Sequence, residues 1–373
     1  MNGQWIGDFS GTNTGTIMVN MDSLSTHFAG VAYVNDARSG MPGIAVFLKT
    51  KDKKHKFHLT LTRISFSPTY RGGGEFITWD QFPRIFPDIV LPTNIAVEGE
   101  WSDTSLTLNW TTDIGTNGNC TLHKGISDPR SGFPLKTMGW ADFKRMVAQL
   151  DHRRFIFRGQ SDTWPLRTSF HRTGRADLLK FLNVDVPTLH RTLSARTKHI
   201  FNLEMPNQNG AFLNLVQHHG YPTPLLDWSF SPFVGAFFAY RGISSVEANK
   251  ASKTKRVRIF IFDQKQWRED FPQMTQLSLG SPHFSLWEFI AIDNERMIPQ
   301  QGISSVTNVD DIERYLAKCC TTARKTYLRI VELPWKDRDK VMKELSLMGI
   351  TAGSLFPGLD GACEELRERM LST

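Results

Sequence analysis

The first 124 residues alternate short apolar segments with turns rich in Gly, Asn and Asp. Residues 57–62, which read Phe-His-Leu-Thr-Leu-Thr, alternate apolar and polar side chains as a strand with one buried face does. Similar segments, rich in β-branched and aromatic residues, recur at 16–20, 31–34, 45–48, 95–101 and 106–111. This pattern predicts that residues 1–124 form an all-β domain, a small antiparallel barrel or sandwich that serves as an accessory or docking module.

The apolar pattern is interrupted between residues 125 and 136. This stretch contains Gly125, Pro129, Gly132 and Pro134 and few apolar side chains. Gly and Pro favour turns and loops and interrupt regular structure. We therefore predict an interdomain linker over residues 125–136.

From residue 137 to residue 373 the pattern is that of mixed helices and strands. Apolar residues at helical spacing predict a helix over 140–150, with Thr137 at its N-terminal cap. Residues 155–157 predict a short strand that ends at Arg158, and residues 232–240 predict a buried helix. Further helices are expected at 176–182, 188–203, 212–218 and 336–347, and further strands at 257–262, 288–292 and 303–306. The predicted fold class is α+β, an all-β domain followed by an α/β domain.

The overall composition is that of a globular protein. The 373 residues are 40% hydrophobic and 22% charged, which suits two or three domains of about 100–200 residues. No apolar run reaches the roughly 18–20 residues of a membrane-spanning helix, and the N-terminus lacks the basic and apolar regions of a secretion signal. The four cysteines show no metal-binding spacing. We expect a cytoplasmic protein with free thiols, no metal site and no membrane contact.

The chain is basic, with a formal net charge of +7 and a pI of about 9.2. This charge permits a polyanionic partner such as nucleic acid without requiring one. The densest basic stretch lies at residues 250–258, where a loop is expected to enter a strand. We interpret it as a solvated loop, with a nucleic-acid contact as the alternative.

Four segments of the second part are distinctive when they are taken in order. They are Phe155-Ile156-Phe157-Arg158-Gly159-Gln160, the run from residue 217 to residue 239, Asn294-Glu295-Arg296 with Gln300-Gln301-Gly302, and residues 348–361. In this order they resemble the FRG domain family, which is named for a Phe-Arg-Gly triplet that stands here at residues 157–159. The resemblance implies an FRG domain over residues 137–373.

The same order of elements is similar, more loosely, to the ADP-ribosyltransferase superfamily. Its core begins with an aromatic-Arg-Gly at a strand end, continues with a Ser-x-Ser that enters a helix, and ends with an acidic residue at a later strand. Arg158, then Ser229 and Ser231, then Glu295 stand at the matching positions, and Glu288 and Gln301 compete for the last of them. The resemblance implies an ADP-ribosyltransferase-like core that uses NAD.

The residue types at these positions suit ADP-ribosyl transfer, whose transition state resembles the cation-like sugar of glycoside hydrolysis. The guanidinium of Arg158 suits the pyrophosphate, and Gly159 permits close approach of the backbone. Ser229 suits the ribose, and the carboxylate of Glu295 suits the developing positive charge. The predicted catalytic residues are Glu295, Ser229 and Arg158, and the predicted cofactor-binding residues are Arg158, Gly159, Gln160, His219, Asp227, Ser229, Ser231 and Gln301.

Structural roles for the same residues stay open at this point. Arg158 could form an ion pair within the protein or bind a phosphate. Asp227 could orient Arg158 or cap a helix. Ser229 and Ser231 precede Pro232 and suit a helix start, since Pro is favoured in a first turn. His219 suits packing or helix capping as well as a substrate contact.

The sequence thus predicts an NAD-dependent ADP-ribosyltransferase, a bacterial toxin or anti-phage defence effector that modifies a macromolecule. RNA or another nucleic acid is the favoured acceptor, protein is an alternative, and an antitoxin or regulatory protein is an expected partner. The competing hypothesis is a non-catalytic FRG module that senses a nucleotide. A nuclease is a third, for which we find no paired carboxylates at the spacing of a two-metal site.

Overall fold

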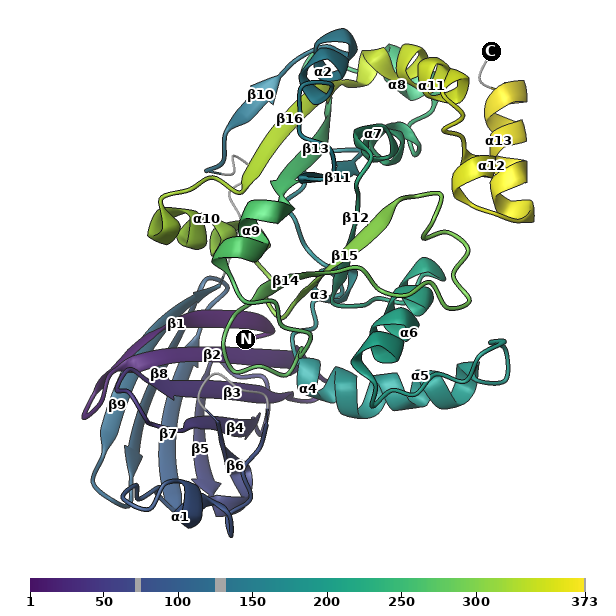
Figure 1. The fold of residues 1–373 in the computed structure, drawn as a ribbon. Coiled ribbons are helices and arrows are strands. Elements are labelled where there is room, and N and C mark those ends of the chain that lie inside the picture. The colour runs from purple at the N-terminus through teal and green to yellow at the C-terminus, as the bar shows by residue number, and fades with distance from the viewer. Residues whose placement is uncertain (71–74, 125–131, 372–373) are drawn as a thin grey trace.

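The computed structural model describes residues 1–70, 75–124 and 132–371. Within these residues the strands form two sheets, one from the N-terminal part of the chain and one from the remainder (Figure 1). The predicted α+β class is confirmed at this level. No helix in the described ranges is long and apolar enough to cross a membrane.

The N-terminal sheet is antiparallel and runs in the order β5-β7-β8-β9-β1-β2-β3-β4-β6. Its strands are β1 (Gly3–Gly11), β2 (Gly15–Ser23), β3 (Phe28–Asp36), β4 (Gly43–Lys49), β5 (Lys56–Thr62), β6 (Phe66–Thr69), β7 (Asn94–Trp101), β8 (Ser105–Thr112) and β9 (Asn117–Lys124). The short helix η1 (Arg63–Ser65) joins β5 to β6, the two ends of this order, so the sheet curls into a nearly closed barrel (Figure 1). A short helix, α1 (Phe82–Ile85), lies in the connection from β6 to β7.

Alternation of side chains explains the barrel. In β5, Leu59 and Leu61 are buried, whereas the intervening Thr60 is exposed. The same alternation in β8 and β9 places Leu106 and Leu122, both fully buried, in one apolar interior. Of the predicted barrel or sandwich, the structure shows a nearly closed barrel, in which the curled sheet buries its own apolar face.

The second sheet runs in the order β10-β16-β13-β11-β12-β15-β14. Its strands are β10 (Leu135–Thr137), β11 (Phe155–Gln160), β12 (Leu225–Ser229), β13 (Arg256–Asp263), β14 (Phe284–Trp287), β15 (Gly302–Thr307) and β16 (Leu328–Pro334). β10 pairs with β16 in parallel, and the other neighbours are antiparallel. In β13, Ile259 and Ile261 pack on one face and Phe260 and Phe262 on the other, so both faces are covered.

Helices cover the two faces of this sheet. One face carries α2 (Trp140–Val147), α7 (Pro232–Tyr240), α8 (Ser245–Lys250) and α11 (Arg338–Leu347), and the other carries α9 (Gln264–Asp270) and α10 (Ile312–Ala323). The remaining helical elements are α3 (Ser169–Arg172), α4 (Leu178–Lys180), the π-helical turn η2 (Phe181–Asp185), α5 (Val186–Leu193), α6 (Pro206–His218), η3 (Trp335–Asp337), α12 (Ala352–Leu355) and α13 (Leu359–Leu371).

Several local predictions differ from the structure. The helix predicted at 188–203 ends at Leu193 in α5, and residues 194–203 form turns and loops. Residues 125–131 of the predicted linker lie outside the described residues, and its last residues belong to β10. Thr137 is the last residue of β10, and Gly139 takes the cap position of α2 instead. The predicted strand at 288–292 is wrong: these residues connect β14 to β15, and Phe289 is buried there as a loop residue.

The barrel contacts the second part through the outer face of β1 to β3. Asp22 of β2 accepts hydrogen bonds from the backbone N–H groups of Ala176 and Asp177 and from Nε of Arg175, at 2.7, 3.1 and 3.0 Å. Gln4 of β1 donates to the carbonyl of Asn308 at 2.7 Å. These buried, directional contacts dock the barrel on the second part in one orientation.

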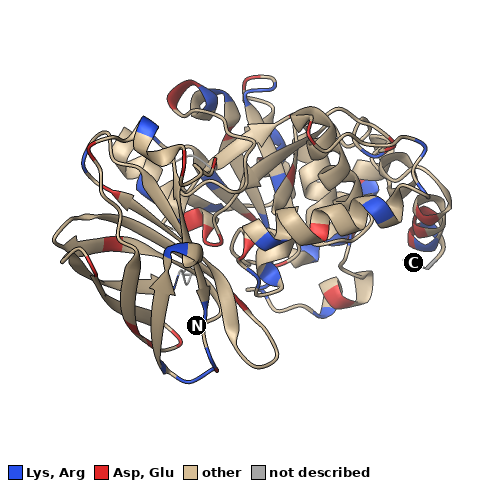
Figure 2. Ribbon diagram, turned by 90° about the horizontal axis from the view of Figure 1, so that it is seen from below, with Lys and Arg blue, Asp and Glu red and all other residues tan. Residues whose placement is uncertain are grey.

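The predicted solvated loop at residues 250–258 is held by ion pairs. Lys255 lies 2.6 Å from Asp162, and the buried Arg258 lies 2.7 Å from Glu332. Figure 2 shows basic and acidic residues interspersed along both parts of the molecule. The charge of this stretch is thus partly neutralised within the chain. The solvated-loop interpretation fits only residues 251–255, because Lys250 ends α8 and residues 256–258 belong to β13, where Arg258 is buried.

Candidate functional site

A pocket of about 320 Å³ lies where β11, β12, the end of α6 and the start of α7 meet. Four of the predicted site residues, Arg158, Gly159, Asp227 and Ser229, line it together. They come from two strands that pair at Phe157 and Ser229. The other lining residues are Phe157, Gln217, His218, Trp228, Gly235, Phe238, Arg241, Arg296, Gln300 and Phe356.

Arg158 lies at the end of β11 with its guanidinium in the pocket. Its Nη1 donates to the backbone carbonyl of Asp227 at 2.6 Å, and its buried Nε has no hydrogen-bond partner within the described residues. Burial lowers the pKa of Arg158 to about 10, and the nearby Asp227 opposes that shift. Arg158 therefore stays charged at neutral pH and keeps a donor available for a ligand.

Two further guanidinium groups flank the pocket. Arg241 pairs with Glu364 through two contacts of 2.5 Å, so its charge is already neutralised. Arg296 donates to the carbonyl of His218 at 2.7 Å, and its Cζ lies 5.5 Å from the centre of the Phe356 ring. The local field is therefore positive, which suits a phosphate-bearing ligand.

Asp227 is the acidic side chain that lines this pocket. Its Oδ2 accepts from Nε2 of Gln217 at 2.5 Å, and its Oδ1 accepts from Oγ of Ser304 at 3.3 Å. Nε2 of His218 lies 3.7 Å from Oδ2. The carboxylate is thus fixed in orientation by its neighbours while its side chain keeps 36% of its surface exposed, which leaves it accessible from the pocket.

His218, rather than the predicted His219, lies in the pocket. Its Nδ1 lies 2.9 Å from Oδ1 of Asn294, whose Nδ2 donates to Asn214 at 2.7 Å. His219 is exposed at the C-terminal cap of α6. Asn214, Gln217 and His218 recur at spacings of three and four on one face of α6, a signal that our sequence reading missed.

The two serines after β12 have structural bonds. Ser229 donates from Oγ to the carbonyl of Gln300 at 2.7 Å and accepts from the N–H of Ser231 at 3.0 Å. Ser231 caps α7 by accepting from the N–H of Val234 at 3.3 Å. The helix-start role is therefore confirmed for Ser231, and the only hydroxyl proton of Ser229 is already donated.

Several predicted residues lie outside the pocket lining. Glu295 is exposed in a turn, because the connection from β14 to β15 forms turns instead of the expected strand. Glu288 pairs with Arg153 at 3.2 Å, and Gln301 is exposed at a left-handed backbone position with φ of 47°. Gln160 is buried and donates to the carbonyl of Trp164 at 3.0 Å. Their proposed roles toward a ligand stay predictions.

Gly159 has a packing role in addition to its place in the pocket. A Cβ at this position would lie 2.0 Å from the carbonyl oxygen of Gly235 and 2.6 Å from the backbone nitrogen of Ala239. A Cβ at Gly235 would in turn lie 3.0 Å from Phe157. The triplet at 157–159 thus allows α7 to pack directly on β11, which holds Arg158 beside Asp227.

Comparisons with known proteins identify one family. Residues 153–248 match the family model of the FRG domain. No curated protein matches the chain. One solved structure, "Structure of a redesigned beta barrel, mFAP1, bound to DFHBI", is 15% identical and covers 33% of this chain and 94% of that chain, with a TM-score of 0.22. At that score the likeness carries no conclusion.

Proposed function

Because this chain carries an FRG domain at residues 153–248, we propose that its pocket binds NAD and transfers ADP-ribose to a macromolecule. The observation that supports this best is the charged Arg158, which lines the pocket together with Asp227 and whose Nε is buried without a partner in the described part of the chain. A buried donor without a partner destabilises the folded protein by about 1–3 kcal/mol, so such groups commonly serve a ligand.

Different pocket residues bind different parts of NAD in this proposal. Arg158 and Arg296 take the pyrophosphate, since a guanidinium donates to two phosphate oxygens at once. Asp227 takes a ribose hydroxyl and stabilises the positive charge that develops on the sugar. NAD supplies the ADP-ribosyl group: its bond to nicotinamide breaks, and an acceptor oxygen or nitrogen that loses a proton takes nicotinamide's place.

We assign the acidic role to Asp227 in place of the predicted Glu295. Asp227 lines the pocket and lies beside Arg158, whereas Glu295 is exposed and outside the lining. The ADP-ribosyltransferase-like core is thus proposed with a different acidic residue from the one that the resemblance implies. This change is itself testable by substitution.

The direct test is release of nicotinamide from NAD by the full chain, with cell lysate as the source of acceptor. We expect release by the wild-type protein and a loss of about 10²–10³-fold in Arg158→Ala, the scale of removing one charge-stabilising group. Arg145→Ala serves as the control, because Arg145 is exposed on α2 and is not a lining residue of the pocket. Absence of release by the wild-type protein would reject the transferase proposal.

A second candidate is a nucleotide-sensing module without turnover. The observation that favours it is the hydroxyl of Ser229, which is bonded within the protein and has no proton left to donate to a substrate. In this case calorimetry would detect binding of NAD or ADP-ribose to the wild-type protein and not to Arg158→Ala, with no nicotinamide formed. The two candidates therefore differ in turnover and agree on Arg158.

The biological setting remains part of the proposal. We propose a toxin or anti-phage effector acting in the cytoplasm, with RNA or protein as the acceptor and an antitoxin or regulatory protein as a partner. The net charge of +7 supports an anionic acceptor, although part of the basic stretch is paired within the chain. Labelled NAD followed by separate digestion with ribonuclease and protease would distinguish the two acceptors.

A further inference from the structure

The interior of the N-terminal barrel contains a cavity of about 530 Å³. Its walls are inward-facing side chains of the strands, among them Phe9, Ile17, Leu61, Val97, Leu108 and Trp110. Small barrels are usually filled by their own side chains, or they hold one small ligand. The size of this cavity places it in the range of about 300–1,000 Å³ that is typical of small-molecule sites.

Pairs of an aromatic residue and a glycine keep this interior open. Phe57 lies opposite Gly99, and Trp110 lies opposite Gly118, on neighbouring strands. A Cβ at Gly99 would lie 2.0 Å from the Phe57 ring, and one at Gly118 would lie 2.3 Å from the Trp110 ring. Each ring therefore occupies the space that a side chain at the opposite glycine would take.

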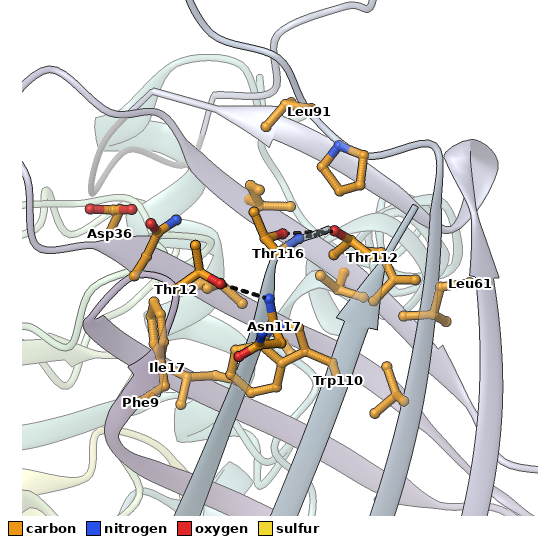
Figure 3. Close-up of a pocket in the computed structure, with 18 of the residues that line it drawn as sticks. Phe9, Thr12, Ile17, Asp36, Leu61, Leu91, Trp110, Thr112, Thr116 and Asn117 are labelled. Atoms are coloured by element: carbon orange, nitrogen blue, oxygen red, sulfur yellow. Dashed lines mark hydrogen bonds between the residues drawn. The ribbon is translucent and has the colours of Figure 1, made fainter. Parts of the chain in front are cut away.

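Polar groups gather at one end of the cavity. Figure 3 shows Thr12, Thr112, Thr116 and Asn117 beyond the apolar residues, with Leu91 above them. The hydroxyls of Thr112 and Thr116 lie 2.7 Å apart, and the N–H of Asn117 donates to Oγ1 of Thr12 at 3.0 Å. Hydroxyl oxygens keep acceptor capacity when they are so bonded, so this end offers hydrogen bonds to a ligand.

Charge at the cavity is confined to its mouth. The charged residues that line it are Asp36, Arg38 and Asp88, and Arg38 pairs with Asp36 through contacts of 3.0 and 2.7 Å. Ile114 and Val90, which also line the cavity, are 43% and 75% exposed. The remaining lining residues are uncharged and the cation at the mouth is already paired, which favours an uncharged ligand, because a buried charge without a partner is strongly unfavourable.

We propose that the barrel interior is a binding site for an uncharged, mainly apolar small molecule with one hydrogen-bonding group at its outer end. An apolar cavity of about 150 Å³ holds benzene, so this one suits a molecule with on the order of 20 non-hydrogen atoms. The site is separate from the pocket that Arg158 and Asp227 line, the FRG pocket, and does not depend on the function proposed for that pocket.

The test uses 1-aminoanthracene, an uncharged three-ring fluorophore with one amine, titrated into the full chain. We expect saturable binding to the wild-type protein with a rise in probe emission. Ala32→Phe places a ring in the cavity and should weaken binding at least about tenfold, since an overpacked site must exclude the probe. Ala96→Phe is the matched control: Ala96 is exposed on β7 and is not a lining residue, so binding should be unchanged.

A second variant covers the case in which Ala32→Phe does not fold, as judged by circular dichroism. Gly99→Ala should push the Phe57 ring from the wall into the cavity and weaken binding in the same direction. Absence of saturable binding to the wild-type protein, or equal binding by wild-type and every folded cavity variant, would overturn the proposal.

Competition tests the chemical class. Dodecanol should displace the probe at a lower concentration than dodecanoate, which has the same chain and a negative head. Stronger displacement by dodecanoate would overturn the assignment of an uncharged ligand.

Discussion

The two cavities of this protein are built in opposite ways. The barrel cavity is lined by apolar side chains that alternate along neighbouring strands, with its charged residues at the mouth. The lining of the FRG pocket includes Arg, Asp, His and Gln side chains that come from positions as distant as 158 and 300. Alternation of apolar and polar side chains along each strand is enough to form an apolar cavity. A charged pocket also needs hydrogen bonds between distant segments to fix each polar group.

Acid should destabilise the second part of the chain, which contains the FRG pocket, more than the barrel. This loss of stability is the largest effect that we expect. His171 and His283 are buried in the second part, and burial lowers the pKa of each to about 4. The unfolded chain, with histidine pKa values near 6.5, binds more protons between pH 6.5 and 4, so the free energy of unfolding falls as pH falls through that window. The loss is on the order of 3 kcal/mol for each histidine at pH 4.

Urea unfolding at pH 7 and at pH 4.5 measures this loss. The variant His171→Gln should reduce the difference between the two pH values, since it removes one titrating group. A free energy of unfolding that is the same at both pH values would show that these histidines are solvated.

Substitution of the carboxylate in the FRG pocket should affect the activity of that pocket and leave ligand binding in the barrel unchanged. Asp227→Asn should lower nicotinamide release about 10²–10³-fold, because a neutral amide stabilises a developing cation poorly. Binding of 1-aminoanthracene should not change, since Asp227 lines the other pocket and not the barrel cavity. Glu295→Gln is the matched comparison and should retain release; the reverse pattern would return the acidic role to Glu295.

Gly159→Ala tests whether the close packing of α7 on β11 is needed for the stability of the protein and for ligand binding in the FRG pocket. Its new Cβ would meet backbone atoms of Gly235 and Ala239, which cannot move aside without moving α7. We expect a loss of about 1–3 kcal/mol in the free energy of unfolding, typical of overpacking, together with weaker NAD binding. Thermal denaturation and calorimetry measure the two effects, and unchanged values in both would contradict the packing role.

Gly99→Ala should give the smallest loss of stability, because its Cβ meets the movable ring of Phe57 instead of backbone. We expect about 1 kcal/mol or less in the free energy of unfolding, with probe binding reduced. A loss of stability larger than that of Gly159→Ala would show that the barrel interior is as tightly constrained as the FRG pocket.

The sequence predicted those elements whose pattern is local. The barrel strands follow from alternation, and α7 follows from Ser231, Pro232 and the apolar run behind them. The strand at 288–292 was wrong because Phe289 is buried in a connection, and a short apolar run does not distinguish a buried loop from a strand.

The candidate site was harder to predict than the fold. Arg158, Gly159, Asp227 and Ser229 were named because the motif contains them. His218 was missed in favour of its neighbour, since adjacent helical positions point in different directions and only the position of β12 shows which one faces the pocket. Arg241, Arg296 and Phe356 depend on packing between distant elements, which spacing along the chain does not reveal.

The most direct test of the FRG pocket is a crystal structure of the full chain with ADP-ribose. We expect the pyrophosphate within hydrogen-bonding distance of the guanidinium of Arg158 and a ribose hydroxyl on the carboxylate of Asp227. ADP-ribose bound elsewhere, or no bound ligand in crystals whose pocket is open to solvent, would contradict the account.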